Sequence, residues 1–189
     1  RVVVNYTKSV TEAEETLGQA KDKGVEALLA QGDVANDDDC RRIAKQTMER
    51  WGRIDMLVNN AGTTKFADHA DLEALNADDF LTIYKVNVVG AFQMIRACAP
   101  HLKASGFGRV VNVSSIAGVL GVGSSVAYAS SKGALNTMTF SLARALAPEI
   151  RVNAVCPGFI GTRWFSERFG PETYARIVEH NKQSTPLHR

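Results

Sequence analysis

The chain has 189 residues, of which 45% are hydrophobic and 22% charged, and its formal net charge is +2. This composition is typical of one globular domain, and the chain has neither a basic run for nucleic acid nor an apolar run long enough for a bilayer. Three scattered cysteines without metal or redox spacing predict reduced thiols in a cytoplasmic protein, namely Cys40, Cys98 and Cys156.

Strands and helices are predicted to alternate along the chain. Short apolar, β-branched runs predict strands at 2–6, 25–30, 54–59, 109–115 and 150–156. Capping residues, glycines and a proline delimit helices at about 9–24, 37–51, 76–102 and 125–147, and a further helix is expected at about 162–181. Buried strands alternating with helices are typical of a parallel sheet covered on both faces, so we predict a single, doubly wound α/β domain.

A tyrosine and a lysine one helical turn apart form the centre of the candidate site. Tyr128 and Lys132 are four residues apart and therefore share one face of the helix predicted at 125–147. A neighbouring ammonium favours the phenolate, so Lys132 is expected to lower the pKa of Tyr128 from its usual value of about 10. Ser115 ends the preceding strand and can donate to a carbonyl oxygen that Tyr128 protonates. The alternative is that the pair only forms part of a solvated helix face.

Further motifs accompany this pair. The sequence Asn-Asn-Ala-Gly at 59–62 follows the third predicted strand, and Pro-Gly at 157–158 follows the last. Together with Ser115 and Tyr-x-x-x-Lys, these motifs resemble the classical short-chain dehydrogenase/reductase family from residue 1 to about residue 162. The resemblance implies a Rossmann-type oxidoreductase that transfers hydride between a nicotinamide cofactor and a carbonyl or secondary alcohol. Segments 5–6 and 59–65 are similar to 3-oxoacyl-thioester reductases; an inert fragment and a nucleotide-sensing binding module are the alternatives.

The resemblance also implies roles for other residues. Lys132 would bind the nicotinamide ribose, and Asn87 would hold a water in a proton relay to it, although such an amide can instead cap a neighbouring backbone group. Asp33, at the end of the second strand, can accept a hydrogen bond from an adenine amino group or serve as a turn or helix cap. The predicted cofactor-binding residues are Asn5, Tyr6, Asp33, Val34, Asn59, Ala61, Gly62, Tyr128, Lys132, Pro157, Gly158, Ile160 and Thr162.

The residues after the first predicted strand indicate which nicotinamide cofactor is used. NAD-using members place an acidic residue there to hold the ribose 2′-hydroxyl. This chain has Asn-Tyr-Thr-Lys at 5–8, where Lys8 or a hydroxyl could receive a 2′-phosphate, so we predict NADP(H) over NAD(H). The region 162–189 is expected to form the substrate loop, and the glycines at 118–123 a mobile loop beside it. The histidines show no metal-ligand spacing, so no metal site is predicted.

Some of the predicted elements need neighbours that residues 1–189 do not supply. The family opens with a strand and a glycine-rich pyrophosphate loop, and its sheet order places that strand between the strands at 2–6 and 54–59. It also closes with a further strand. We therefore expect a slot or another segment between these two strands, and further residues before Arg1 and after Arg189. The helices at 76–102 and 125–147 are apolar nearly all round, which predicts a homodimer or homotetramer.

Overall fold

The computed structural model describes residues 1–186, apart from the side chains of Trp164 and Arg168. The chain forms two compact units, Arg1–Cys156 and Pro157–Arg189. All the strands of the described residues belong to the first unit. The second unit begins just before the region 162–189 that the sequence assigns to the substrate loop, so each unit is described by itself.

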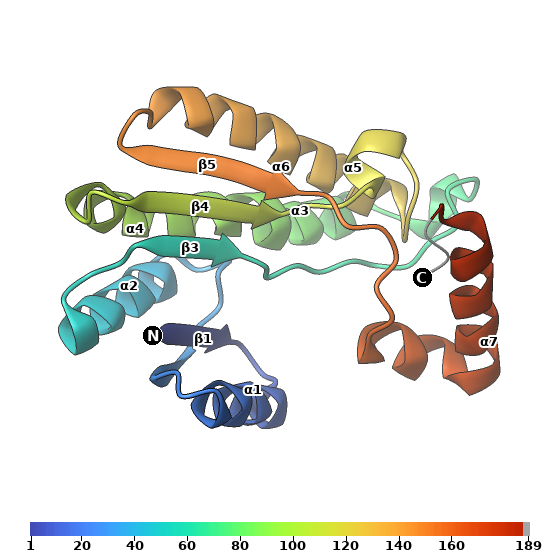
Figure 1. The fold of residues 1–189 in the computed structure, drawn as a ribbon. Helices are drawn as coiled ribbons and strands as arrows, with labels where there is room; N and C mark the ends of the chain where they lie inside the picture. The colour runs from blue at the N-terminus through green and yellow to red at the C-terminus, as the bar shows by residue number, and fades with distance from the viewer. Residues whose placement is uncertain (187–189) are drawn as a thin grey trace. The chain divides into compact units, whose positions relative to one another are not determined.

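The strands of the first unit form two parallel sheets. One sheet pairs β1 with β2, and the other has the order β3-β4-β5 (Figure 1). Because every paired strand is parallel and its connection passes through a helix, the predicted α/β class is confirmed. The bounds are β1 Val2–Tyr6, β2 Ala27–Gln31, β3 Met56–Asn59, β4 Gly108–Val113 and β5 Ile150–Val155.

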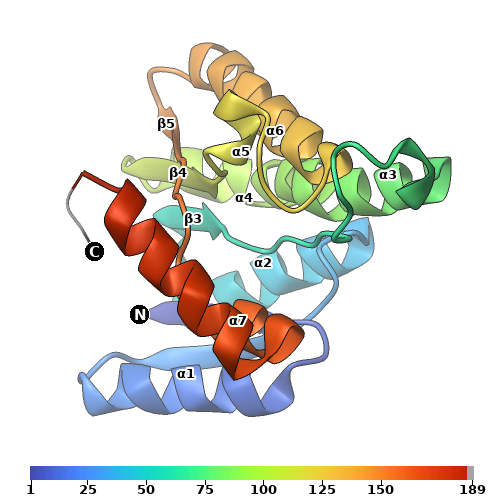
Figure 2. The ribbon, with the colours of Figure 1, turned by 90° about the vertical axis from the view of Figure 1, so that its right-hand side faces the viewer.

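Helices bury the sheets through their apolar faces. The helices concerned are α1 (Val10–Asp22), α2 (Asp37–Trp51), α4 (Ala91–Ala104) and α6 (Val126–Ala145). Helix α1 packs against β1 and β2, α2 against α4, α4 mainly against β4, and α6 against β5. Figure 2 shows α4 and α6 on the same face of the three-stranded sheet. Val110 and Asn112 of β4 are fully buried, whereas Met56 and Val58 of β3 are exposed.

The helix predicted at 76–102 is divided into three parts. It begins as α3 (Ala77–Tyr84), passes through a π-helical turn (η2, Lys85–Gly90), and continues as α4. Asn76 caps it as predicted, and Asn76 and Asp79 form a reciprocal capping box. The π-helical turn was not predicted, and such turns are frequent at functional sites.

Two short helices occupy segments whose conformation the sequence left open. The 3-10 turn η1 (Leu72–Ala74) lies in the stretch before Asn76, between the predicted strand at 54–59 and the predicted helix at 76–102. Helix α5 (Ala117–Leu120) covers the first residues of the loop predicted around 118–123, and residues 121–123 are not helical. Gly121 ends α5 with a left-handed φ of 70°, a conformation that glycine adopts without strain.

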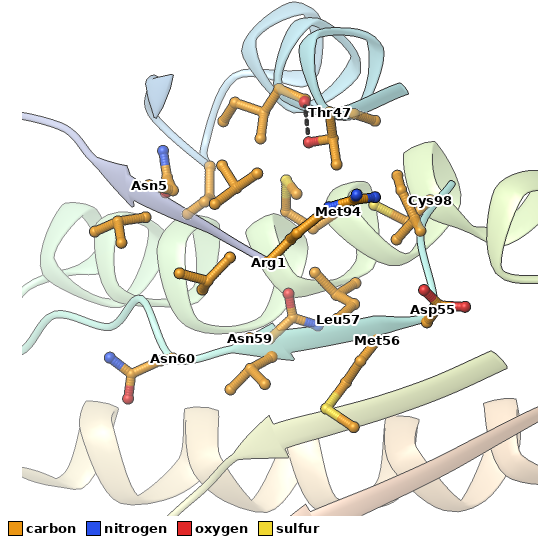
Figure 3. Close-up of a pocket in the computed structure, with 18 of the residues that line it drawn as sticks. Arg1, Asn5, Thr47, Asp55, Met56, Leu57, Asn59, Asn60, Met94 and Cys98 are labelled. Carbon is orange, nitrogen blue, oxygen red and sulfur yellow. Dashed lines mark hydrogen bonds between the residues drawn. The ribbon is translucent and has the colours of Figure 1, made fainter. Parts of the chain in front are cut away.

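A cavity separates the two sheets of the first unit. Strands β1 and β3 are not paired with each other, and the space between them has a volume of about 680 Å³ (Figure 3). Residues of both strands line it together with Thr47 of α2 and with Met94 and Cys98 of α4. The interruption expected between the strands at 2–6 and 54–59 is therefore confirmed.

The second unit consists mainly of a kinked helix. Helix α7 (Arg163–Ser184) contains a break at Gly170, whose φ of 71° and ψ of 166° are not helical, directly before Pro171. The ring of Phe159 packs edge-on against Phe165, with centroids 4.9 Å apart, and lies 6.5 Å from the ring of Tyr174. The aromatic side chains thus hold the segment before α7 against the helix.

Candidate active site

The carboxyl end of β4 and the first turns of α6 bring the predicted serine, tyrosine and lysine together. Ser125 caps α6 by accepting a hydrogen bond from the backbone N–H of Tyr128, which places this tyrosine in the first turn. The Ser115 side chain lies near the Tyr128 hydroxyl, close enough to favour the phenolate form. Lys132 follows one turn later, with its Nζ 5.7 Å from the centroid of the Tyr128 ring.

Helix α6 is fixed to the end of β4 by two hydrogen bonds at Lys132. The Lys132 ammonium donates to the carbonyl oxygen of Val113 at 2.8 Å. The hydroxyl of the buried Ser114 donates to the carbonyl oxygen of Lys132 at 3.1 Å. Since Val113 and Ser114 directly precede Ser115, these bonds set the distance between the serine and the tyrosine.

Burial controls the pKa of both titratable residues in this group. It lowers the pKa of Lys132 to about 8, although the nearby Cys156 opposes this shift. Burial also raises the pKa of Tyr128, while the nearby Ser115 side chain acts in the opposite direction. The expected lowering of the tyrosine pKa by Lys132 is therefore not seen, because desolvation of the phenolate outweighs favourable interactions.

Asn87 lies in the π-helical turn, and its side chain is 1% exposed. Its Oδ1 accepts a hydrogen bond from the backbone N–H of Thr63 at 2.8 Å. Its Nδ2 donates to the carbonyl oxygen of Thr63 and to Oγ of Ser131, both at 3.0 Å. The amide thus binds the backbone after β3, which is the alternative that the sequence left open, while its second N–H is used by Ser131.

The segment after β3 approaches the lysine closely at a glycine. A Cβ atom on Gly62 would lie 3.5 Å from Oδ1 of Asn87 and 3.7 Å from Nζ of Lys132. Gly62 is exposed, so its backbone leaves open space beside the ammonium. Asn59 contributes differently: its side chain is buried and donates to Oδ1 of Asn112 at 2.9 Å, so it supports the sheet.

The residues predicted to bind the adenosine half of a cofactor lie at the end of β1 and after β2. Asp33 is exposed, and its Oδ1 accepts from the backbone N–H of Ala35 at 2.9 Å, which is the turn contact considered as the alternative to adenine binding. Val34 is buried and packs against Gly90, where a Cβ atom would come within 2.8 Å of its side chain. The Asn5 amide donates to the carbonyl oxygens of Ala30 and Gly32 at 3.0 Å each, which ties β1 to the end of β2.

Four of the predicted cofactor-binding residues belong to the second unit. Pro157, Gly158, Ile160 and Thr162 lie in the second unit, where Thr162 is the residue before α7. Throughout residues 1–186, no group of three His, Cys, Asp or Glu side chains is placed to hold a metal ion. His188, considered with the other histidines in the sequence, lies outside the described residues.

A network of buried, hydrogen-bonded polar side chains behind the site was not predicted from the sequence. Asn59 donates to Asn112, Asn112 donates to Oγ1 of Thr139 at 2.9 Å, and Thr139 donates to the carbonyl oxygen of Leu135 on α6 at 2.8 Å. Ser131 was also missed. A polar residue three positions after Tyr128, on the same helix face, was the signal that could have identified it.

The residues fit a dinucleotide at the carboxyl ends of the strands. In open parallel sheets this edge is where ligands bind. An ammonium has three N–H donors, so Lys132 keeps donors for ribose hydroxyls after its bond to Val113. Gly62 leaves room beside that ammonium, and the Tyr128 hydroxyl lies one helical turn away.

A parallel α/β fold with serine, tyrosine and lysine at this edge defines a class of nucleotide-binding oxidoreductases. The model of the short chain dehydrogenase family matches residues 1–172. The chain therefore belongs to the short-chain dehydrogenase/reductase family, as the resemblance predicted.

Individual relatives agree with this assignment. The chain is 44% identical over its whole length to a Streptomyces violaceoruber protein assigned as ketoacyl reductase 2 of the granaticin polyketide synthase, and it covers 73% of that protein. It is 34% identical over 163 residues to a 3-oxoacyl-[acyl-carrier-protein] reductase of Synechocystis, with 86% of this chain and 65% of the relative covered. The chain thus spans about two thirds to three quarters of the length of these two curated relatives.

Solved structures show the same fold. A short-chain dehydrogenase/reductase from Burkholderia xenovorans is 39% identical, with a TM-score of 0.88 over 100% of this chain and 74% of that one. An NAD⁺-bound xylitol dehydrogenase is 32% identical, with a TM-score of 0.84 over 99% of this chain and 76% of that one.

Proposed function

We propose that the protein reduces a carbonyl compound, of the 3-oxoacyl thioester class, with NADP(H) as cofactor. The observation that carries this proposal is the grouping of Ser115, Tyr128 and Lys132: the Lys132 ammonium lies 5.7 Å from the Tyr128 ring and binds the carbonyl oxygen of Val113, two residues before Ser115. Ketoacyl and 3-oxoacyl substrates are named for two of the relatives above, which supports the substrate class.

The residues of the chain would orient the substrate and deliver a proton. A bound reduced nicotinamide supplies the hydride that adds to the carbonyl carbon. Ser115 donates a hydrogen bond to the carbonyl oxygen, and Tyr128 transfers its phenolic proton to that oxygen, which yields the alcohol. The phenolate left behind lies near Lys132, which carries its positive charge below a pKa of about 8 and so stabilises it. A proton from solvent then restores the tyrosine.

Asn87 supports this site through the backbone. Its amide hydrogen bonds to Thr63 hold the loop after β3 near Lys132. Because both N–H groups of the side chain are occupied, a relay water would have to bind to another group of this residue. A π-helical turn interrupts the regular i→i−4 ladder, so the backbone of this turn is the candidate.

The proposal of NADP(H) is based on residues at the ends of β1 and β2. Tyr6, Thr7 and Arg42 line a cavity of about 560 Å³ beyond β1 and β2, and Asp39 in the same cavity is paired with Arg42. Asp33 also lines this cavity, so the support for a 2′-phosphate comes from the hydroxyls of Tyr6 and Thr7 and from Lys8 directly after them in the sequence. In the described residues, no helix has the length and hydropathy needed to cross a membrane.

NADPH oxidation, followed by absorbance, tests the reaction with a panel of 3-oxoacyl thioesters and simple ketones. Tyr128→Phe removes the proton donor and is expected to reduce kcat by about 10² or more, while NADPH binding changes little. Tyr84→Phe, at a half-buried tyrosine that ends α3, is the matched control. Tight NADPH binding without turnover of any substrate would contradict the proposal and favour a nucleotide-binding module.

A further inference from the structure

Ser131 is a buried hydroxyl that the proposed chemistry does not use. It is 0% exposed and lies on α6 between the proton donor and the adjoining lysine. Its Oγ donates to the carbonyl oxygen of Tyr128 at 2.7 Å and accepts a hydrogen bond from Nδ2 of Asn87 at 3.0 Å. One hydroxyl therefore connects helix α6 to the π-helical turn.

The direction of these bonds determines how the Asn87 amide is oriented. A hydroxyl has a single proton, and Ser131 donates it to the Tyr128 carbonyl, so towards Asn87 the oxygen can only accept. The NH₂ group of Asn87 must therefore face Ser131. This orientation directs Oδ1 to the backbone N–H of Thr63, while Nδ2 also reaches the Thr63 carbonyl oxygen. A flipped amide would place oxygen against oxygen at both acceptors.

We infer that Ser131 is a positioning residue that locks Asn87 and, through it, the loop after β3. Asn87 forms hydrogen bonds with both the backbone N–H and the carbonyl oxygen of Thr63. The preceding residue, Gly62, lies beside Lys132: a Cβ atom added to this glycine would be 3.7 Å from Nζ of the lysine. The hydroxyl thus holds the loop at a fixed distance from the lysine on the same helix. For catalysis, the inference rests on the proposed function, because it assumes that Lys132 and Tyr128 act in the reaction.

Substitution of Ser131 by alanine tests the inference without requiring turnover. It would leave an N–H of Asn87 buried without its acceptor, so that only the two bonds to Thr63 would hold the amide in place. Exchange of the Thr63 backbone amide, measured by NMR on the full chain, is expected to rise about tenfold or more. Ser130→Ala is the matched control, because the Ser130 hydroxyl donates only to the Ala127 carbonyl oxygen at 3.0 Å, and it should leave Thr63 protected.

Two outcomes would overturn the inference. One is a Thr63 amide that stays equally protected in Ser131→Ala; the other is an equal rise in Ser130→Ala. Ser131→Cys keeps the size and a weak acceptor, so it should give an intermediate rate, and it replaces the alanine variant if that variant fails to fold.

Measurements of kcat and KM test the catalytic part of this inference separately from the proposed reaction itself. If the protein reduces a carbonyl substrate, Ser131→Ala should lower kcat about tenfold with little change in KM for that substrate, since binding groups are intact. An unchanged kcat would refute the catalytic part. If the wild-type protein reduces none of the substrates, the proposed reaction fails, while the exchange of Thr63 still decides the role of Ser131.

Discussion

The contact between α5 and α6 at Gly118 allows a quantitative prediction about the site. A Cβ atom at this position would lie 2.4 Å from the carbonyl carbon of Lys132, 2.6 Å from the backbone nitrogen of Gly133 and 2.8 Å from the Lys132 carbonyl oxygen. All three are backbone atoms of α6, so no flexible side chain can move aside. Ordinary contact begins near 3.4 Å, and Gly118→Ala must therefore separate α5 from α6 by about 1 Å.

This displacement is expected to lower both the free energy of unfolding and the rate of the proposed reaction. Overpacking of this kind costs about 1–3 kcal/mol, which corresponds to a fall in Tm of roughly 2–12 °C for a chain of this size. The Gly118 N–H donates to the Ser115 carbonyl oxygen at 3.1 Å, so the serine moves with α5. A misplacement of about 1 Å at a reacting group can cost about 10² in rate.

Thermal unfolding and kcat/KM for NADPH-dependent reduction measure the two effects. Gly18→Ala is the control, since nothing lies within 4 Å of a Cβ atom there and a helical alanine should stabilise α1 by roughly 0.5–1 kcal/mol. A Gly118→Ala variant with wild-type Tm and wild-type rate would refute the argument that this glycine sets the position of Ser115.

Three further predictions concern pH, cofactor and assembly. The pKa of Lys132 is about 8 when folded and near 10.5 when unfolded, so the unfolded chain binds more protons than the folded chain between these pH values, and the free energy of unfolding should rise with pH there. The rise is measured as the difference between the wild-type protein and Lys132→Met, in which the contribution of the cysteines with raised pKa values cancels. Equal slopes of unfolding free energy against pH in the two proteins would contradict the prediction. We expect kcat/KM to favour NADPH over NADH; a tenfold preference for NADH would reject the argument from Lys8. Exposed Phe92 and Phe140 on α4 and α6 lead us to expect a dimer or tetramer, and a monomer in sedimentation at micromolar concentration would oppose this.

Elements with strong local signals could be predicted from the sequence. Helix α2 has its predicted bounds because Asn36 accepts hydrogen bonds from two backbone N–H groups at its start and Gly52 adopts a left-handed φ of 70° at its end. Tyr128 and Lys132 were identifiable because their spacing places them on one face of α6. Parallel pairing followed from the alternation of strands with helices.

Features that depend on distant contacts could not be predicted. The π-helical turn coincides with the bonds of Asn87 to Thr63 and Ser131, which are 24 and 44 residues away. The pKa of Tyr128 depends on its burial, which the spacing of Tyr128 and Lys132 does not reveal. The use of Asn59 in the buried chain to Asn112 depends likewise on the register between β3 and β4.

The cavity between β1 and β3 has a consequence for how the first unit unfolds. Without strand pairing across it, the β1-α1-β2 part is joined to the rest mainly by α2 on α4, by the ion pair of Asp37 with Arg96 at 2.6 Å, and by the bond of Gln93 to the Val34 carbonyl oxygen at 2.7 Å. One hydrophobic core nevertheless runs past the cavity, from Ala30 and Val34 on the side of β2 to Val110 and Val152 in β4 and β5. Side-chain packing, and not backbone pairing, therefore couples the two sheets of residues 1–156, so loss of the α2–α4 contact would loosen both of them together.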